Sequence, residues 1–245
     1  FSFGAGIVHN NVGQTVEASI IDAMPVNLAD PGVRAGGRVD VKAHDATTLD
    51  AKTDAVSVTV AVSLGSGTLA VAAAVSTLEL DGSTSAFIDH SKVQALGGDV
   101  TVDAQSDSTL TNKTLAFSLS ASVSVAGLAA AAAVGESSND VTQGVHARIG
   151  DGSSVTASQA VKVTADDNDM DSILRLDSDA ISLGLAGTSL GIALGSNTVE
   201  SDVTASIEGS TVHANGSPVY TDLGGGDFAW VGGEITVHAE SIHDA

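Results

Sequence analysis

The chain resembles itself at a fixed interval, and this repetition limits its possible folds more than any other feature. Short segments with the pattern V/I-x-V-x-A recur along it, separated by 61, 61 and 74 residues. They begin at Val39, Val100, Val161 and Ile235. The longer final spacing is explained by a glycine-rich insertion near residues 216–232. The chain is therefore interpreted as successive copies of one structural unit.

Two further patterns recur at about the same interval as the first. A phrase of the form I-x-x-(x)-S-x-V-x-A starts at Ile88, Ile149 and Ile207, and turn glycines stand at Gly67, Gly127 and Gly187. Together they predict a repeat of about 61 residues. The expected division is a partial repeat over 1–53 and repeats over 54–114, 115–176 and 177–245, the last with the insertion. Because the pattern is already under way at Phe1, the chain is expected to be an excerpt of a longer protein.

Within each unit, apolar residues alternate with Ser and Thr. The clearest case is residues 117–125, where Phe, Leu, Ala and Val alternate with serine, and residues 56–64 and 181–186 follow the same rule. A period of two residues is typical of a β-strand with two chemically different faces. Each segment is predicted to be a strand with an apolar and a hydroxyl face. The serine faces are interpreted as hydrogen-bonding ladders between neighbouring strands.

A second apolar segment follows each of these strands. Residues 128–134 contain five consecutive alanines, which would favour a helix on intrinsic propensity. The equivalent segments 69–75 and 190–195 argue against a helix, because the latter holds Gly191 and Gly195 within a short apolar run. All three copies are therefore predicted to be strands buried on both faces.

The remainder of each unit is predicted to be short strands separated by polar corners. Examples are residues 81–83, 97–99 and 150–153, which are rich in Gly, Asp and Ser. Short strands, regular corners and a fixed period predict an all-β, elongated β-solenoid with parallel ladders about 4.8 Å apart. The alternative is a string of separate β-sandwich modules. It is disfavoured because 61 residues is short for a sandwich and no proline-rich linker separates the units.

Charge narrows the possible partners. The net charge is -21, from nine Lys and Arg against 30 Asp and Glu, and no basic residue follows Arg175. Nucleic acid and anionic membranes both need a cationic surface, so neither is expected as a partner, and no membrane insertion is expected. Divalent cations are favoured as counterions, although a solvated acidic surface explains the charge more simply. The absence of cysteine excludes disulfides and thiolate metal sites.

One acidic segment is the best candidate for a metal site. Carboxylate and amide oxygens close together can wrap a hard cation such as calcium. The candidate ligands are Asp166, Asp167, Asn168, Asp169 and Asp171. The segment lacks the twelve-residue loop of an EF-hand and the glycine-aspartate nonapeptide of calcium-binding β-rolls. A solvated corner is the competing interpretation, so calcium is a hypothesis only. The seven histidines show no ligand spacing and predict no metal site.

The insertion near 216–232 is the second candidate site. It contains Tyr220, Phe228 and Trp230, which include the only Tyr and the only Trp of the chain. Aromatic side chains on a surface loop suit contact with a protein or glycan partner. Alternatively, Phe228 and Trp230 cover the apolar edge of the solenoid. The glycines at 224–226 are expected in a surface loop, because the lysine and helix of a phosphate-binding loop do not follow them.

The pattern I-x-x-S-x-V-x-A followed by V-x-V-x-A, with Ser-, Ala- and Gly-rich strands between, resembles the repeats of very large secreted bacterial proteins. These are the filamentous-haemagglutinin-like and leukotoxin-like adhesins of Gram-negative bacteria. The resemblance covers nearly the whole chain but carries no catalytic or binding motif. It implies a β-solenoid stalk at the cell surface or outside the cell, with a role in adhesion, aggregation or biofilm matrix.

The expected function is therefore structural and adhesive, without an enzymatic activity. Its expected partners are neighbouring repeats, copies of itself, and host or matrix glycans or proteins. The first hypothesis is an adhesin stalk, and the alternative is a subunit of a self-assembling matrix fibre. A polysaccharide-acting enzyme on a β-helix is less favoured, because such sites combine carboxylates with Arg or Lys and basic residues are scarce here.

Overall fold

The computed structural model describes residues 1–25, 32–62, 67–123, 128–183, 186–216, 219–224, 227–231 and 233–244. This part of the chain is all-β and contains no helix. The strands are β1 (Ser2–Ile21), β2 (Val33–Ala35), β3 (Val39–Asp45), β4 (Thr48–Val62), β5 (Thr68–Asp89), β6 (Lys92–Ala95), β7 (Val100–Ser106), β8 (Thr109–Val123), β9 (Leu128–Gly150), β10 (Ser154–Ala157), β11 (Val161–Leu183), β12 (Ala186–Ile207), β13 (Thr211–Ala214), β14 (Val219–Gly224), β15 (Asp227–Val231) and β16 (Ile235–Asp244).

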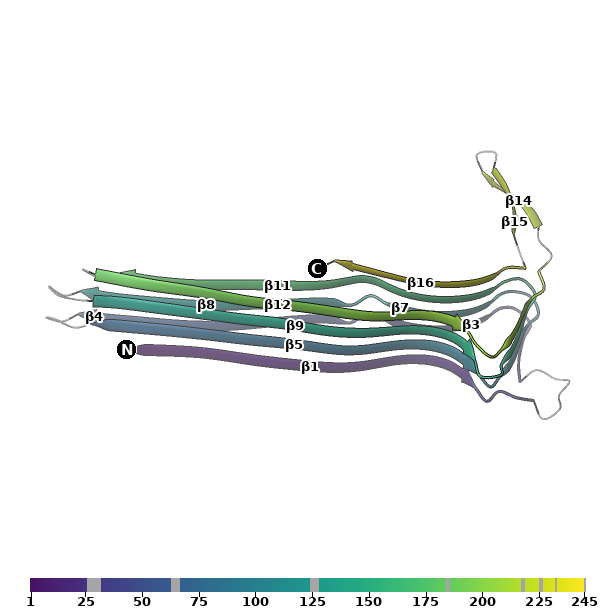
Figure 1. Ribbon diagram of the computed structural model, residues 1–245, viewed down its shortest axis with the longest axis horizontal. Coiled ribbons are helices and arrows are strands. Elements are labelled where there is room, and N and C mark those ends of the chain that lie inside the picture. Colours follow the sequence, from purple (N-terminus) through teal and green to yellow (C-terminus); the bar gives the residue numbers. More distant parts are fainter. Residues whose placement is uncertain are drawn as a thin grey trace.

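The strands stack into three parallel sheets that lie along one elongated body (Figure 1). The first long sheet has the order β1-β5-β9-β12, and a corner sheet has the order β13-β10-β6-β2. The second long sheet contains β3, β4, β7, β8, β11 and β16. The chain runs along the first long sheet, turns through the corner sheet and returns along the second. This winding is β-solenoid-like.

Segments with the same sequence pattern lie side by side. Val39 pairs with Val100, Val100 with Val161, and Val161 with Ile235, all in parallel. Ile149 likewise lies between Ile88 and Ile207 in the first long sheet. Parallel ladders that run through all the units exclude a string of separate sandwich modules. The turn glycine Gly127 lies outside the described residues.

The strands are much longer than predicted. β5 has 22 residues, and β9 and β11 have 23 each. The corners at 97–99 and 150–153 are turns, with positive φ angles of 52° at Asp151 and 77° at Gly152. The corner predicted at 81–83 is wrong, because these residues continue β5. Gly82 has a packing role there: a Cβ atom would lie 1.9 Å from Oε1 of Gln143 on the neighbouring strand.

The alanine-rich segment is a strand, as predicted, but it is not buried on both faces. In β9 the side chains of Ala129, Ala131 and Ala133 are buried, whereas Leu128 is 64% exposed. Residues of β12 from Ala186 onward are exposed on both faces over most of the strand. In the central strands only the face opposite the other long sheet is enclosed, and β12 is exposed on both faces because it is the last strand of its sheet.

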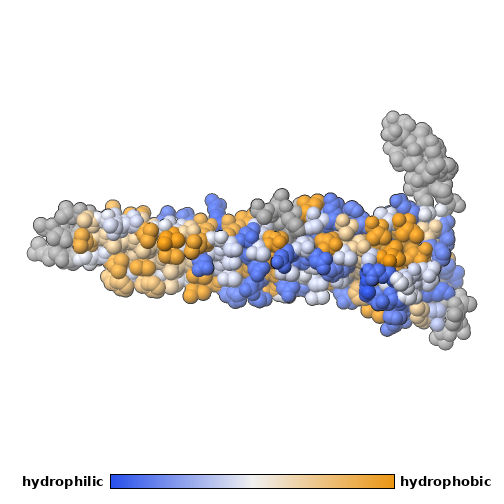
Figure 2. All heavy atoms as spheres, viewed as in Figure 1, coloured by the Kyte–Doolittle hydropathy of each residue, from blue (hydrophilic) through white to orange (hydrophobic). Residues whose placement is uncertain are grey.

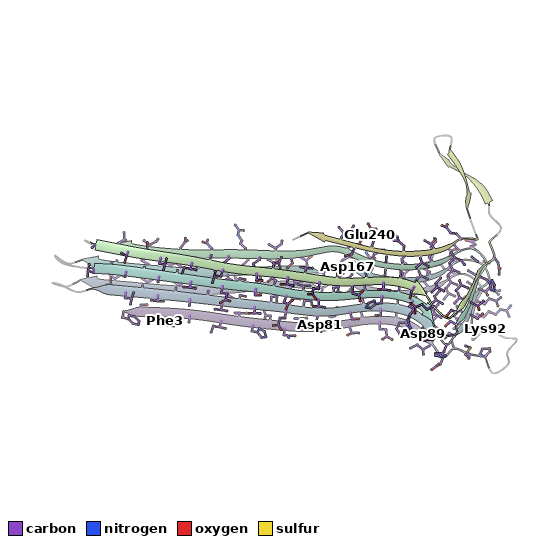
Figure 3. The ribbon with its side chains drawn as sticks, viewed as in Figure 1. Phe3, Asp81, Asp89, Lys92, Asp167 and Glu240 are labelled. Carbon is purple, nitrogen blue, oxygen red and sulfur yellow. The ribbon has the colours of Figure 1, made fainter. Side chains whose placement is uncertain are left out.

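In the half of the body that holds Phe3 in Figure 3, serine and alanine side chains are buried, whereas larger aliphatic side chains are exposed. Ser118 and Ser120 of β8 are fully buried, while Val56 and Val58 of β4 are more than half exposed. Ser118 donates a hydrogen bond of 3.0 Å to the carbonyl oxygen of Ala70 in the facing sheet. The prediction of ladders within one sheet is therefore corrected here: this serine bonds across the layer.

The interior changes along the strands. Next to the corner sheet its apolar residues are Val, Ile and Ala, further along mainly Leu and Val, and finally only the alanines Ala55, Ala74, Ala116 and Ala133, which lie there among buried serines. Close approach of the two long sheets explains the small side chains. A Cβ on Gly4 would lie 2.5 Å from the carbonyl oxygen of Val56, and one on Gly191 would lie 2.6 Å from that of Ser178.

Candidate functional site

The acidic segment predicted as a corner lies inside strand β11. Successive side chains of a strand point to opposite faces, so Asp166 and Asp167 diverge. Asp166 is half-buried on the outer face, and Asp167 is fully buried between the sheets. Asn168 is half-buried, and the side chains of Asp169 and Asp171 lie outside the described residues. The strand conformation therefore prevents Asp166 and Asp167 from chelating one ion together.

Asp166 instead meets residues of the adjacent strand β16. It pairs in register with Glu240, and the preceding outward residue, Thr164, pairs with His238. One ligand atom from each of Asp166, His238 and Glu240 lies within 4.8 Å of the others. Nε2 of His238 is 3.3 Å from Oε2 of Glu240. Figure 3 shows Glu240 on β16, beside the strand that carries Asp167.

The carboxyl group of Asp166 is electrostatically unfavourable as an anion. Burial raises its pKa above the ordinary value, and the nearby Asp103 and Glu240 raise it further, while His238 acts in the opposite direction. A bound cation would offset both the burial and the repulsion. Its Oδ1 atom is buried and has no hydrogen-bond partner among the described residues. This cluster is therefore the best-supported cation position in the described part of the chain.

The donor set differs from the one predicted. Calcium takes six to eight oxygen ligands in proteins, whereas zinc combines imidazole nitrogen with carboxylate oxygen. One imidazole and two carboxylates fit a zinc-like ion better than calcium. His238 and Glu240 were missed in the sequence, although aligning the segments that begin at Val161 and Ile235 places Glu240 beside Asp166. Calcium at the predicted ligands stays a prediction.

The buried carboxylates belong to an internal polar layer. The hydroxyl of Ser201 on β12 donates to Oδ2 of Asp167. At the equivalent position of β3, Asp45 accepts hydrogen bonds from Gln14 at 2.8 Å and from Thr47 at 2.7 Å. Ser106 of β7 lies between Asp45 and Asp167 in the sheet. Gln14 and Ser201 of the facing sheet, together with Thr47, thus bind these two carboxylates internally.

The insertion that carries the aromatic residues forms a hairpin. Strands β14 and β15 pair antiparallel, with Tyr220 opposite Trp230 and Asp222 opposite Phe228. The hairpin stands away from the stacked sheets in Figure 1. A surface loop was predicted, but residues 219–224 and 227–231 form strands, which their β-branched and aromatic residues favour. The side chains of Tyr220, Phe228 and Trp230 lie outside the described residues, so their partner-binding role remains a prediction.

The described residues contain no helix long and apolar enough to span a bilayer. Comparisons with known proteins identify no relative: no family model, no curated protein and no solved structure matches the chain.

Proposed function

We propose that the chain is a structural segment of a giant extracellular adhesin or surface stalk of a Gram-negative bacterium, without enzymatic activity. Its β-solenoid would consist of repeats of about 61 residues. The observation that supports this proposal best is the register of the return strands, in which residues 39–45, 100–106 and 161–167 lie side by side. Each unit adds one layer to each sheet, which in the second long sheet is two consecutive strands such as β3 and β4, so the same structure can be extended by adding units.

The fold suits a stalk for a mechanical reason. Every backbone hydrogen bond between units lies along the stacking direction, and each unit contacts mainly the units before and after it. Buried side-chain bonds reinforce this direction. For example, the hydroxyl of Ser172 donates to Oδ1 of Asn197 at 2.7 Å, and Asn139 donates to the oxygen of Ser172 at 3.1 Å. Pulling on the array would load many bonds together.

The alternative is a subunit of a self-assembling matrix fibre. The outer strands of the described sheets, β1 and β12 in the first long sheet, have a free edge that could pair with another chain. The stalk is preferred because the acidic charge of -21 opposes close packing of many copies unless cations screen it. Both functions place the chain outside the cell, with glycans or proteins as partners.

A length measurement on tandem arrays tests the stalk. Residues 54–176 would be duplicated in frame once, twice and three times, and the particle length would be measured by small-angle X-ray scattering and atomic force microscopy. We expect the dimension along the stack, perpendicular to the strands, to grow by about 4.8 Å for each added repeat, and therefore by about 9.6 Å for each duplication of these two repeats. Cells that display the longest array should bind glycan-coated surfaces better than cells displaying a scrambled control. A constant dimension along the stack would refute the solenoid, and unchanged adhesion would refute the adhesive role.

A further inference from the structure

Three of the nine basic residues lie in one row across the outer face of the second long sheet. Lys52 of β4 pairs in register with Lys113 of β8, and Lys113 pairs in register with Arg175 of β11. All three side chains are exposed. Neighbouring strands are about 4.8 Å apart, so the row spans about 9.6 Å between its first and last backbone positions. We name these three residues the cationic ladder.

The ladder is electrostatically unfavourable within the chain itself. Like charges opposite one another on neighbouring strands repel and destabilise a sheet. The chain has 30 Asp and Glu, and Lys42, Arg148 and Lys162 each form an ion pair with an aspartate. Among the described residues, by contrast, no ion pair joins a carboxylate to Lys113 or Arg175. The stacked cations therefore favour a bound anion as their counterion.

A hollow of about 270 Å³ lies over the ladder. Besides the three cations, its lining includes Asp54, Leu115 and Asp177, which form the next outward-facing row of the same strands. Nζ of Lys52 lies 2.8 Å from Oδ2 of Asp54. An ammonium group has three donors, so this ion pair leaves Lys52 able to bind a further acceptor. The hollow thus combines donors, acceptors and one apolar side chain in a small volume.

The positive surface is only one row wide. Asp54 and Asp177 border it on one side, and Asp50 borders it on the other. A bilayer or a duplex nucleic acid presents a broad anionic surface, which these aspartates and the net charge of -21 would repel. The ladder therefore fits a single narrow chain that carries anionic groups.

Two kinds of narrow anionic chain fit poorly. In an extended acidic peptide, side chains on one face recur about every 6.6 Å, which does not match the step of about 4.8 Å between the cations. Single-stranded nucleic acid is bound largely by stacking of its bases on aromatic side chains. None of the described residues that line the hollow is aromatic. A polysaccharide is the remaining class, and it needs no aromatic platform for its charged groups.

We propose that the cationic ladder binds an acidic polysaccharide with a carboxylate on each sugar unit, a polyuronate. The guanidinium of Arg175 binds a carboxylate through two parallel hydrogen bonds, and Lys113 binds one as a point charge. The sugar hydroxyls donate to the carboxylates of Asp54 and Asp177. The C–H face of a sugar ring packs on Leu115. Every group that lines the hollow thus has a partner on a uronic acid unit.

The surface beside the ladder also suits sugar rings. On β4, Val56 and Val58 follow Asp54 on the same outer face and are 57% and 51% exposed. In Figure 2, hydrophobic residues gather over the end of the body that lies away from the β14–β15 hairpin. The ladder therefore lies beside apolar side chains, which offer contacts to the C–H faces of bound sugar units.

The inference rests on the proposed function and deepens it, because it names the class of glycan and the surface that binds it. The stalk itself is tested by the dimension of the tandem arrays, which does not depend on the ladder. Failure of the ladder to bind a polyuronate would therefore leave the stalk standing.

Binding to immobilised polygalacturonate tests the proposal. Surface plasmon resonance of the whole chain would be recorded in chelator, so that no metal ion bridges carboxylates. We expect binding that weakens as sodium chloride is raised, because the ladder is exposed to solvent. Dextran, which is uncharged, and polyglutamate, an acidic peptide, should each bind at least about tenfold more weakly. Absence of binding to polygalacturonate would overturn the proposal, and so would equal binding to polyglutamate.

Variants separate the ladder from the overall charge. Lys113→Gln and Arg175→Gln should each weaken binding of polygalacturonate about threefold to fivefold, and the double variant about tenfold or more. Lys162→Gln removes the same charge from an exposed position of β11 outside the ladder, and it should change binding less than about 1.5-fold. Circular dichroism would verify that the variants keep the β fold. An equal loss with Lys162→Gln would overturn the proposal, since binding would then follow net charge alone.

Discussion

The side-chain amide of Asn112 donates a hydrogen bond of 3.0 Å to Oδ1 of Asn139, across the gap between the two long sheets. Both residues are fully buried. Ser76 donates to Oδ1 of Asn112 at 2.8 Å, and Asn139 in turn donates to Ser172 at 3.1 Å. The two sheets are thus joined by a continuous buried chain of hydrogen bonds in the middle of the molecule.

Removing one member of this chain should be costly. Asn139→Ala would remove the buried hydrogen bonds that Asn139 accepts from Asn112 and donates to Ser172, so we expect a loss of about 1–3 kcal/mol in the free energy of unfolding. Urea denaturation followed by circular dichroism would measure it. Asn11→Ala is the matched control, because Asn11 makes an exposed hydrogen bond of 2.8 Å to Glu79, and its loss should cost less than about 0.5 kcal/mol. Equal effects of the two variants would contradict this account.

Because the interior has room only for alanine here, a larger side chain should affect stability very differently at two adjacent residues. Ala133 is fully buried and faces the second long sheet, whereas Ala132 points outward. Ala133→Leu should destabilise the protein by about 1–3 kcal/mol or more, because the sheets are too close for a larger side chain. Ala132→Leu should change stability by less than about 0.5 kcal/mol. Thermal and urea unfolding at low protein concentration would measure both. If both substitutions are tolerated, the close approach of the sheets is wrong.

Asp103 should contribute to acid sensitivity. Burial alone would raise its pKa, but hydrogen bonds from Thr164 and Lys42, with the positive charge of Lys42, outweigh it and lower the pKa below the ordinary value of 3.8. The unfolded state therefore binds a proton first as the pH falls, so stability is lost below about 4. Asp103→Asn should make the acid limb of the stability curve less steep. Urea denaturation at a series of pH values would measure this. The same slope of unfolding free energy against pH in both proteins would contradict the interpretation.

Asp166 should have the opposite effect. Burial raises its pKa above 3.8, so the folded state holds its proton more tightly than the unfolded state. Stability therefore falls as the pH rises from the ordinary range of aspartate through the raised pKa. Asp166→Asn should stabilise the metal-free protein at neutral pH and make no difference at low pH. The two aspartate variants thus act as controls for each other. If Asp103→Asn and Asp166→Asn changed the pH dependence of stability in the same direction, the assigned environments would be wrong.

A bound metal ion should stabilise the protein at the cluster that contains Asp166. We expect zinc to raise the melting temperature through Asp166, His238 and Glu240, and chelator to lower it without unfolding the apolar core. Calcium should raise it modestly if the ligands predicted from the sequence are used. Scanning calorimetry in each metal, in sodium chloride of equal ionic strength and in chelator would separate binding from screening.

His238→Ala should abolish the zinc response, whereas His213→Ala, on another strand, should not. The same curve in zinc and in sodium chloride would exclude a site at this cluster. Collapse of the fold on chelation would show instead that the metal is integral to it.

The sequence alone indicated that the chain is built of strands and which of them are neighbours. A strand was predicted for residues 128–134 despite five alanines, because their equivalents at 190–195 contain glycine. The recurring patterns identified Val39, Val100 and Val161 as equivalent, and these residues pair in the sheet. Both predictions succeed because strand geometry and ladder pairing are local consequences of sequence and repetition.

Only the tertiary structure decided which face of each strand points inward. Alternation shows that residues 117–125 have an apolar and a hydroxyl face, but burial of either depends on the distance to the facing sheet. At Gly4 and Gly191 that distance leaves no room for a side chain, so Ser118 and Ala133 fit inside and Val58 remains outside. The V/I-x-V-x-A pattern aligns β16 with β11, but only the tertiary structure shows that ligand atoms of Asp166, His238 and Glu240 lie within 4.8 Å of one another, because this depends on the direction of each side chain.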